Sequence, residues 1–132
     1  MAPATSLSIS DAAHATGVSA HTLRYYERVG LMLDAVPRAG ASHHRRYTEA
    51  ELRWIVLLTK LRATGMPIRT IKQYADLARE GDGNEAERLA LLEQHRTAVL
   101  EHLNETRRNL EAIDTKIALY RERLEQDART AA

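Results

Sequence analysis

The feature that most constrains this chain is a hydrophobic stripe in its last third. From Leu89 to Leu124, alternating steps of three and four residues form a seam that only Arg96 and Thr106 interrupt across five heptads. This repeat is typical of an α-helix that buries one narrow face against another helix. No glycine or proline follows residue 83, so the pattern predicts one helix of roughly 36 residues, about 54 Å long.

A helix of this length cannot bury its hydrophobic stripe in the small core that the rest of the chain can form. Pairing the stripe with the same helix of a second copy is the direct solution, and we therefore expect a coiled-coil homodimer. The alternative is a helix folded back on the first half of its own chain. The residues expected at the dimer interface are Leu92, Val99, Leu103, Leu110, Ile113, Ile117 and Tyr120.

The composition favours a mainly α protein, because 44% of the residues are apolar but only 5% are aromatic. The 132 residues suit one modest domain or a small domain plus an extended element. The net charge of +1 hides an asymmetry, since residues 1–74 hold ten Arg and Lys against five Asp and Glu, whereas residues 75–132 hold nine against thirteen. We expect that only the basic first half meets a polyanion.

The chain has no cysteine, which excludes disulfides, thiolate metal sites and thiol redox sensing. The N-terminal residues lack the pattern of a signal peptide, and no run reaches the 18 apolar residues of a membrane span, so we expect a cytoplasmic protein. The six histidines lack the companions of a metal site, and no nucleophile–base pair is present. We expect no metal, no cofactor and no enzymatic activity.

Two short helices joined by a glycine are predicted near the N-terminus. Residues 10–16 begin with a capping serine, Ser10, and stop at Gly17. Ser19 is the expected N-cap of the second helix, where Val18 and Leu23 can form a hydrophobic staple. This arrangement is typical of a helix-turn-helix.

The second of these helices has two distinct faces. Leu23, Tyr26 and Gly30 fall on the side of the expected core, and a second stripe holds His21, Arg24, Tyr25 and Arg28. Arginine can bind guanine edges or phosphates, and a tyrosine can contact the phosphate and sugar of the backbone. The stripe therefore predicts a DNA-binding face, and the alternative is an ordinary solvated helix face.

A small hairpin, or wing, is expected between Gly30 and Arg46, where Arg38, Arg45 and Arg46 could reach flanking phosphates. Thr48 and Glu51 form a capping-box pattern that opens a helix ending at Gly65, and Pro67 starts another. The expected organisation is a DNA-binding domain with a helix pair, a linker, a dimerisation helix and a tail, at residues 7–80, 81–84, 85–126 and 127–132.

These motifs together resemble the MerR family of bacterial transcription regulators over nearly the whole chain. The resemblance rests on "TLRYYE", "GL", "RRY" and the terminal heptad helix. It implies a winged helix-turn-helix, a helix pair and an antiparallel coiled coil. It also implies a homodimer that binds a palindromic element in double-stranded promoter DNA, distorts an overlong spacer, and so represses or activates RNA polymerase. Distorting DNA costs several kcal/mol, which lets an effector act as a switch.

The resemblance also suggests roles for individual residues. Arg24 matches the base-contacting arginine of the recognition helix, and His21 matches a position that often reaches the groove. Tyr25 and Tyr26 match aromatic residues at the DNA backbone. His44 and Arg45 match the wing pair, although the family usually has tyrosine where His44 stands.

The coiled coil is most similar to the aldehyde- and nitrosative-stress branch of the family. Thiol-sensing members of that branch carry a cysteine where this chain has Lys60. An effector, if there is one, would bind near Trp54, Tyr74 and His95, whose alternative role is helix packing. The rival to the regulator hypothesis is a coiled-coil scaffold whose basic N-terminal module binds a protein partner or non-specific DNA.

Overall fold

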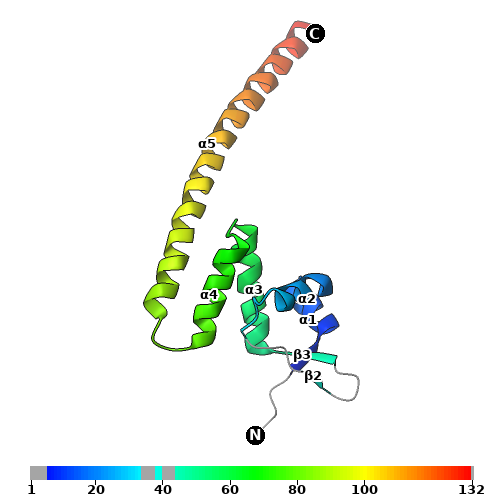
Figure 1. Cartoon of the computed structure of the whole chain (residues 1–132). Coiled ribbons are helices and arrows are strands. Elements are labelled where there is room, and N and C mark those ends of the chain that lie inside the picture. The colour runs from blue at the N-terminus through cyan, green and yellow to red at the C-terminus, as the bar shows by residue number, and fades with distance from the viewer. Residues whose placement is uncertain (1–5, 34–37, 40–43, 132) are drawn as a thin grey trace. The chain divides into compact units, whose positions relative to one another are not determined.

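The computed structural model describes residues 6–33, 38–39 and 44–131 (Figure 1). The chain divides into two compact units. The first unit is Met1–Glu93 and the second is Gln94–Ala132. The elements in chain order are β1 (Ser6–Ser8), α1 (Ile9–Thr16), α2 (Ala20–Arg28), β2 (Arg38–Ala39), β3 (His44–Thr48), α3 (Glu49–Ala63), α4 (Ile68–Glu80) and α5 (Glu85–Ala131).

The first two helices form the predicted helix-turn-helix, with one correction at its start. Ser8, and not Ser10, caps α1, and its hydroxyl accepts a hydrogen bond from the Asp11 N–H at 3.2 Å. Ser8 takes this role because it ends β1 in an extended conformation, which an N-cap requires. Gly17 ends α1 with a φ of +72°, and the Ser19 hydroxyl accepts from the Thr22 N–H at 3.1 Å, both as predicted.

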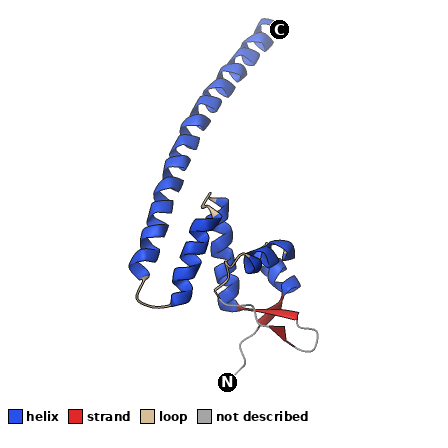
Figure 2. Ribbon diagram, in the orientation of Figure 1, coloured by secondary structure: helices blue, strands red, loops and turns tan. Residues whose placement is uncertain are grey.

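A small antiparallel sheet contains the predicted hairpin and one strand that the sequence pattern did not reveal (Figure 2). The strand order is β1-β3-β2. The β2–β3 pair aligns Arg38 with Arg45, and this pair is the wing. β1 pairs with the other edge of β3, where Leu7 faces Tyr47. Its three residues are too few to show an alternating pattern, so only the partner strand reveals it.

The helix pair packs the core of the first unit, and α3 and α4 lie side by side in Figure 1. Thr48 caps α3 as predicted, because its hydroxyl accepts a hydrogen bond from the Glu51 N–H at 3.3 Å and also donates to the Glu51 carboxylate. Pro67 is the N-cap of α4 and Ile68 its first residue. The largest fully buried side chains are Leu23, Leu31, Tyr47, Ile55, Leu58, Met66 and Ile71.

The turn between α4 and α5 is held by a buried asparagine. The Asn84 amide donates to the Leu77 carbonyl at 2.8 Å, and the Arg88 Nε donates to the Asn84 Oδ1 at 2.8 Å. Hydrogen bonds from the backbone N–H groups of Glu85 and Gly83 lower the pKa of the exposed Glu85 carboxyl. The predicted break at residues 81–84 therefore has defined geometry in the first unit.

The helix α5 extends beyond its predicted end. Its last residue is Ala131, so most of the expected tail at residues 127–132 is helical. The physical reason is local, because no helix breaker is present and Arg129 pairs with Glu125 at 3.5 Å. No described residue of α5 is fully buried. Within the described part of the chain, no helix combines the length and apolarity needed to cross a membrane.

The predicted seam of α5 divides between the two units. Leu92 is half-buried and packs against the core of the first unit in its own chain. In the second unit, the apolar seam side chains are largely solvent-exposed, with Leu110 at 52% and Ile113 at 56%. A stripe of this kind in water indicates a surface that a partner covers.

Candidate nucleic-acid interface

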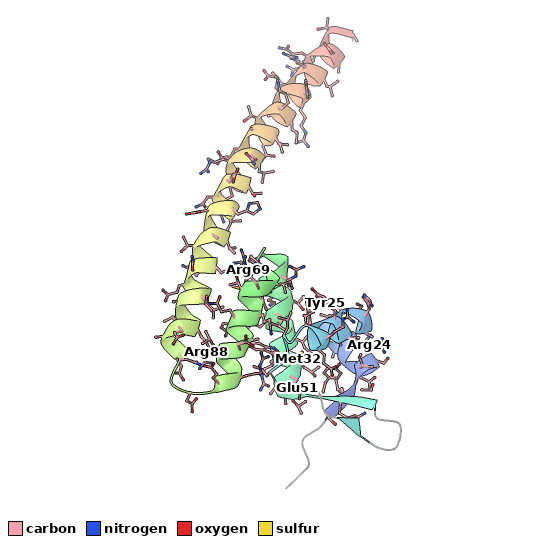
Figure 3. The ribbon with its side chains drawn as sticks, viewed as in Figure 1. Arg24, Tyr25, Met32, Glu51, Arg69 and Arg88 are labelled. Carbon is pink, nitrogen blue, oxygen red and sulfur yellow. The ribbon has the colours of Figure 1, made fainter. Side chains whose placement is uncertain are left out.

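The helix α2 separates its side chains into a buried face and an exposed face, as the periodicity predicted. Leu23 and Tyr26 are buried, with 1% and 4% of their surfaces exposed. His21, Arg24 and Arg28 are exposed, and Tyr25 is half-buried between the two faces. Figure 3 labels Arg24 and Tyr25 on this helix. The exposed face of α2 therefore presents two guanidinium groups and an imidazole, while the opposite face of the helix packs against the core.

Tyr25 is fixed by its neighbours on α2. Its ring centroid lies 6.3 Å from that of Tyr26, and the two planes are tilted by 49°. The Arg28 guanidinium lies 5.6 Å from the centre of the Tyr25 ring. A cation at this distance is attracted by the ring and keeps an exposed side chain in place. The Tyr25 and Arg28 side chains are therefore partly held in place before any ligand binds.

The end of α2 is a tight turn built on a glycine. Gly30 has a φ of +80°, its N–H donates to the Glu27 carbonyl, and the Leu31 N–H donates to the Tyr26 carbonyl at 2.9 Å. These two bonds form a Schellman motif, which needs a left-handed residue at the Gly30 position. Leu31 is fully buried. The chain that leaves the exposed helix is therefore anchored in the core before it reaches the wing.

Three consecutive carbonyls after α2 are held by side chains from the helix pair. The Arg79 guanidinium donates to the Gly30 carbonyl at 2.9 Å and to the Met32 carbonyl at 2.6 Å. Between them, the Trp54 indole N–H donates to the Leu31 carbonyl at 2.8 Å. Arg79 also binds Asp76 on its own helix. We call the segment Gly30–Met32 with Arg79 and Trp54 the carbonyl clamp.

The carbonyl clamp was not predicted from the sequence. Arg79 lies three residues after Asp76, so its pattern suggests only an ordinary ion pair on a helix surface. Its second role depends on a backbone segment 47 residues earlier in the chain. The local sequence contains no pattern that predicts this contact.

The residues expected at an effector pocket have other surroundings. Trp54 and Tyr74 are buried, and their rings stack with centroids 5.5 Å apart and planes only 8° from parallel. This is the packing role that the sequence left open as the alternative. His95 belongs to the second unit, and its part in an effector site stays a prediction.

Among the predicted wing residues, Arg46 has a described side chain, and its contacts are within the sheet. Arg46 donates to the Ser6 carbonyl at 2.6 Å and to the Ser6 hydroxyl at 3.2 Å, so it links β3 to β1. A phosphate contact of Arg46 stays a prediction. The side chains of Arg38, His44 and Arg45 lie outside the part of the chain that the structure describes.

Metal chemistry has no support among the described side chains. No group of three or more His, Asp or Glu residues in this part of the chain is close enough to hold an ion.

Replacing Trp54 with phenylalanine tests the carbonyl clamp. The ring still stacks on Tyr74, but the Leu31 carbonyl loses its donor, so the free energy of unfolding should fall by about 1–3 kcal/mol. We also expect weaker binding to specific DNA, because α2 and the wing lose a shared anchor. Urea denaturation and gel shifts measure the two effects. Tyr74→Phe keeps the indole donor and should keep DNA affinity, whereas unchanged stability and affinity in Trp54→Phe would contradict this role.

Comparisons with known proteins give a consistent result. Residues 7–77 match the family described as MerR HTH family regulatory protein. An uncharacterized HTH-type transcriptional regulator of Haemophilus influenzae is 37% identical over 83% of this chain and 79% of its own length. Two crystal structures are also similar, a MerR family transcriptional regulator from Listeria monocytogenes and HiNmlR, a MerR family regulator lacking the sensor domain, bound to promoter DNA.

The structural agreement covers most of each chain. The Listeria protein is 34% identical, with a TM-score of 0.80 over 86% of this chain and 85% of that one. HiNmlR is 36% identical, with a TM-score of 0.79 over 89% of this chain and 92% of that one. The match therefore includes the helix-turn-helix, the helix pair and much of the long helix.

Proposed function

Because this chain belongs to the MerR family of helix-turn-helix regulatory proteins, we propose that it binds a palindromic promoter element as a homodimer. It is a transcription regulator and not an enzyme. In this proposal each copy places α2 in the major groove of one half-site, and the distorted spacer between the half-sites controls RNA polymerase indirectly. Promoter binding by HiNmlR supports the proposal for this chain.

The observation that carries the proposal is the exposed stripe on α2. Arg24, Arg28 and His21 project from a helix whose opposite side is buried, and the helix is fixed at both ends by a cap and a Schellman turn. A rigid helix with arginines on its free face fits the width of the major groove and the acceptor pattern of guanine. We assign base contacts to Arg24 and groove or phosphate contacts to His21 and Arg28.

Tyr25 and Tyr26 support the same assignment, and each has a separate role. Tyr25 is half-buried and lies beside Arg28, where its hydroxyl and ring suit a phosphate and sugar. Tyr26 is 4% exposed, so its main role is in the core. A phosphate contact of the Tyr26 hydroxyl stays a prediction. The wing would add flanking backbone contacts through Arg38, His44 and Arg45.

A homodimer follows from the exposed seam of α5. Side chains such as Leu103, Leu110 and Ile113 stay in water unless another helix covers them. Two α2 helices related by twofold symmetry then face two half-sites related by the same symmetry. We propose that the protein acts in the cytoplasm, where it meets promoter DNA, and that it carries no cofactor.

A scaffold function would use the same coiled coil but does not account for the organised cations on α2. A gel shift on the DNA upstream of the protein's own gene separates the two functions. The regulator should give a discrete band that survives competitor DNA and weakens steeply with salt, because bound phosphates release counterions. Diffuse binding that competitor DNA abolishes would support the scaffold instead.

A further inference from the structure

We propose that the last turn of α4 is a rigid joint that sets which half-site spacing the protein accepts, through Asn84 on one side and Arg79 on the other. The proposal rests on the homodimer and the palindrome proposed above, and it assigns spacing specificity to residues outside the DNA-binding face of α2. Asn84 connects α4 to the first turn of α5, and Arg79 connects α4 to the segment that leaves α2. We call Arg79, Asn84 and residues 77–81 the α4 joint.

Asn84 is a buried polar residue whose side chain connects two helices. The Arg88 backbone N–H donates to the Asn84 carbonyl at 3.1 Å, so Asn84 is at the N-cap position of α5. A side chain at this position commonly accepts from a backbone N–H of its own helix. The Asn84 amide nitrogen reaches the preceding helix, where it donates to the Leu77 carbonyl at 2.8 Å, and Oδ1 accepts from the Arg88 Nε at 2.8 Å. A buried amide that is bound at both ends fixes the angle between its partners, because hydrogen bonds are directional.

The start of α5 has a second polar group that serves the backbone, and its apolar contacts are incomplete. The Gly83 N–H donates to the Glu85 carboxylate at 3.0 Å, and a carboxylate in the first turn suits a helix N-terminus. The apolar side chains of this segment that pack on the core of the first unit, Leu91 and Leu92, are only half-buried. Apolar burial is not directional. The Asn84 amide is therefore the group that specifies the direction in which α5 leaves α4.

Arg79 makes the corresponding connection on the other side of the same turn. One guanidinium nitrogen donates to the carbonyls of Gly30 and Met32, and the other binds Asp76 on α4. Lys72 shares this face of α4, and a Cβ on Gly30 would lie only 3.2 Å from its ammonium nitrogen. The turn that ends α2 is therefore in contact with α4 along about two helical turns.

The connections to α5 and to α2 meet within one turn of α4. Leu77, whose carbonyl binds Asn84, lies two residues before Arg79. A helical turn is stiff, because backbone hydrogen bonds join each of its residues to the neighbouring turn. A rotation of the first turn of α5 must therefore either break the Asn84 contacts or move the last turn of α4 and the exit of α2 with it.

In the proposed dimer, the orientation of α2 relative to the start of α5 decides how far apart the two recognition helices lie. Each added base pair moves a half-site by about 3.4 Å and rotates it by about 35° around the duplex. A protein with a stiff joint must distort the DNA to follow this change, whereas a loose joint lets each DNA-binding unit adjust. The α4 joint therefore predicts a narrow preference for spacing, and loosening it should broaden that preference.

Competition gel shifts with a series of duplexes measure the preference. The duplexes carry the palindrome that the protein protects upstream of its gene, with one or two base pairs added to or removed from its centre. We expect full-length wild-type protein to lose at least about 30-fold in affinity for a change of two base pairs, and Asn84→Ala or Arg79→Gln to lose less than about fivefold. The ratio between duplexes cancels any loss that all spacings share. If one variant does not fold, the other tests the same joint.

Three control variants separate spacing from stability and from base reading. Ile71→Val removes one methylene from the buried face of α4, so it should lower stability in urea and keep the wild-type ratio. Asn104→Ala removes an exposed amide from α5 and should change neither quantity. Arg24→Ala should weaken binding by the same factor at every spacing, because it removes a base contact from each half-site.

The double variant Asn84→Ala/Arg79→Gln tests whether the two connections act as one. Its ratio should equal that of either single variant, because each substitution already breaks the path from α5 to α2. Effects that multiply in the double variant would contradict a single joint, and single variants that keep the wild-type ratio would overturn the joint while leaving palindrome binding intact. A wild-type protein that binds no duplex of the series specifically would instead refute the proposed function.

Discussion

Replacing Ile113 with aspartate is expected to convert the dimer to monomers and to lower affinity for the palindromic DNA by more than about a hundredfold. In the proposed dimer, the Ile113 side chain, 56% exposed in the single chain, would lie in the coiled-coil seam. Symmetry places the substitution twice in the interface, and an unpaired carboxylate in apolar surroundings costs several kcal/mol. A monomer holds only one α2 helix, so it also loses the gain from binding two half-sites together.

Sedimentation and gel shifts measure the two effects of Ile113→Asp. Thr115→Asp is the matched control, since it adds the same charge two residues further along α5, opposite the seam. It should stay dimeric and keep its DNA affinity. A dimeric Ile113→Asp protein would show that the exposed stripe is not the dimer interface.

The second large effect is expected from Arg24→Ala, which should weaken specific binding by about 1–3 kcal/mol in each half-site, or about 5- to 150-fold. Arg24 is exposed on α2, where its guanidinium can bind two acceptors of one guanine. The side chain is not part of the core, so the stability and the dimer should not change. The loss should be larger for the specific site than for random DNA, because a base contact carries sequence information.

Arg129→Ala is the control for charge. It removes the same positive charge from an exposed ion pair near the end of α5 and should not change specificity. Competition gel shifts against specific and random duplexes give the ratio directly. If Arg24→Ala weakened both duplexes equally, Arg24 would be a phosphate contact and the base-reading role would be wrong.

Most of the interface could be predicted because its determinants are local in sequence. The Ser19 cap, the glycine turn and the 3.6-residue periodicity of α2 lie within a dozen residues of each other. Such signals specify which side chains share a helix face. The division between buried Leu23 and Tyr26 and exposed Arg24 and Arg28 was therefore available before the fold was known.

Apart from the longer α5, the features that the sequence did not reveal depend on partners that are distant in the chain. β1 exists because β3 pairs with it, and its presence moves the α1 cap to Ser8 and gives Arg46 its contact with Ser6. The carbonyl clamp joins Arg79 and Trp54 to the segment after α2. A backbone carbonyl has no sequence signature, so only tertiary packing shows which side chain reaches it.

Footprinting of the DNA upstream of the gene tests most directly the claim that a symmetric dimer reads two half-sites with α2. Hydroxyl-radical cleavage with the wild-type protein should show two protected patches related by twofold symmetry on one face of the duplex, and Arg24→Ala should weaken both together. A single asymmetric patch, or uniform protection along the whole fragment, would contradict the account.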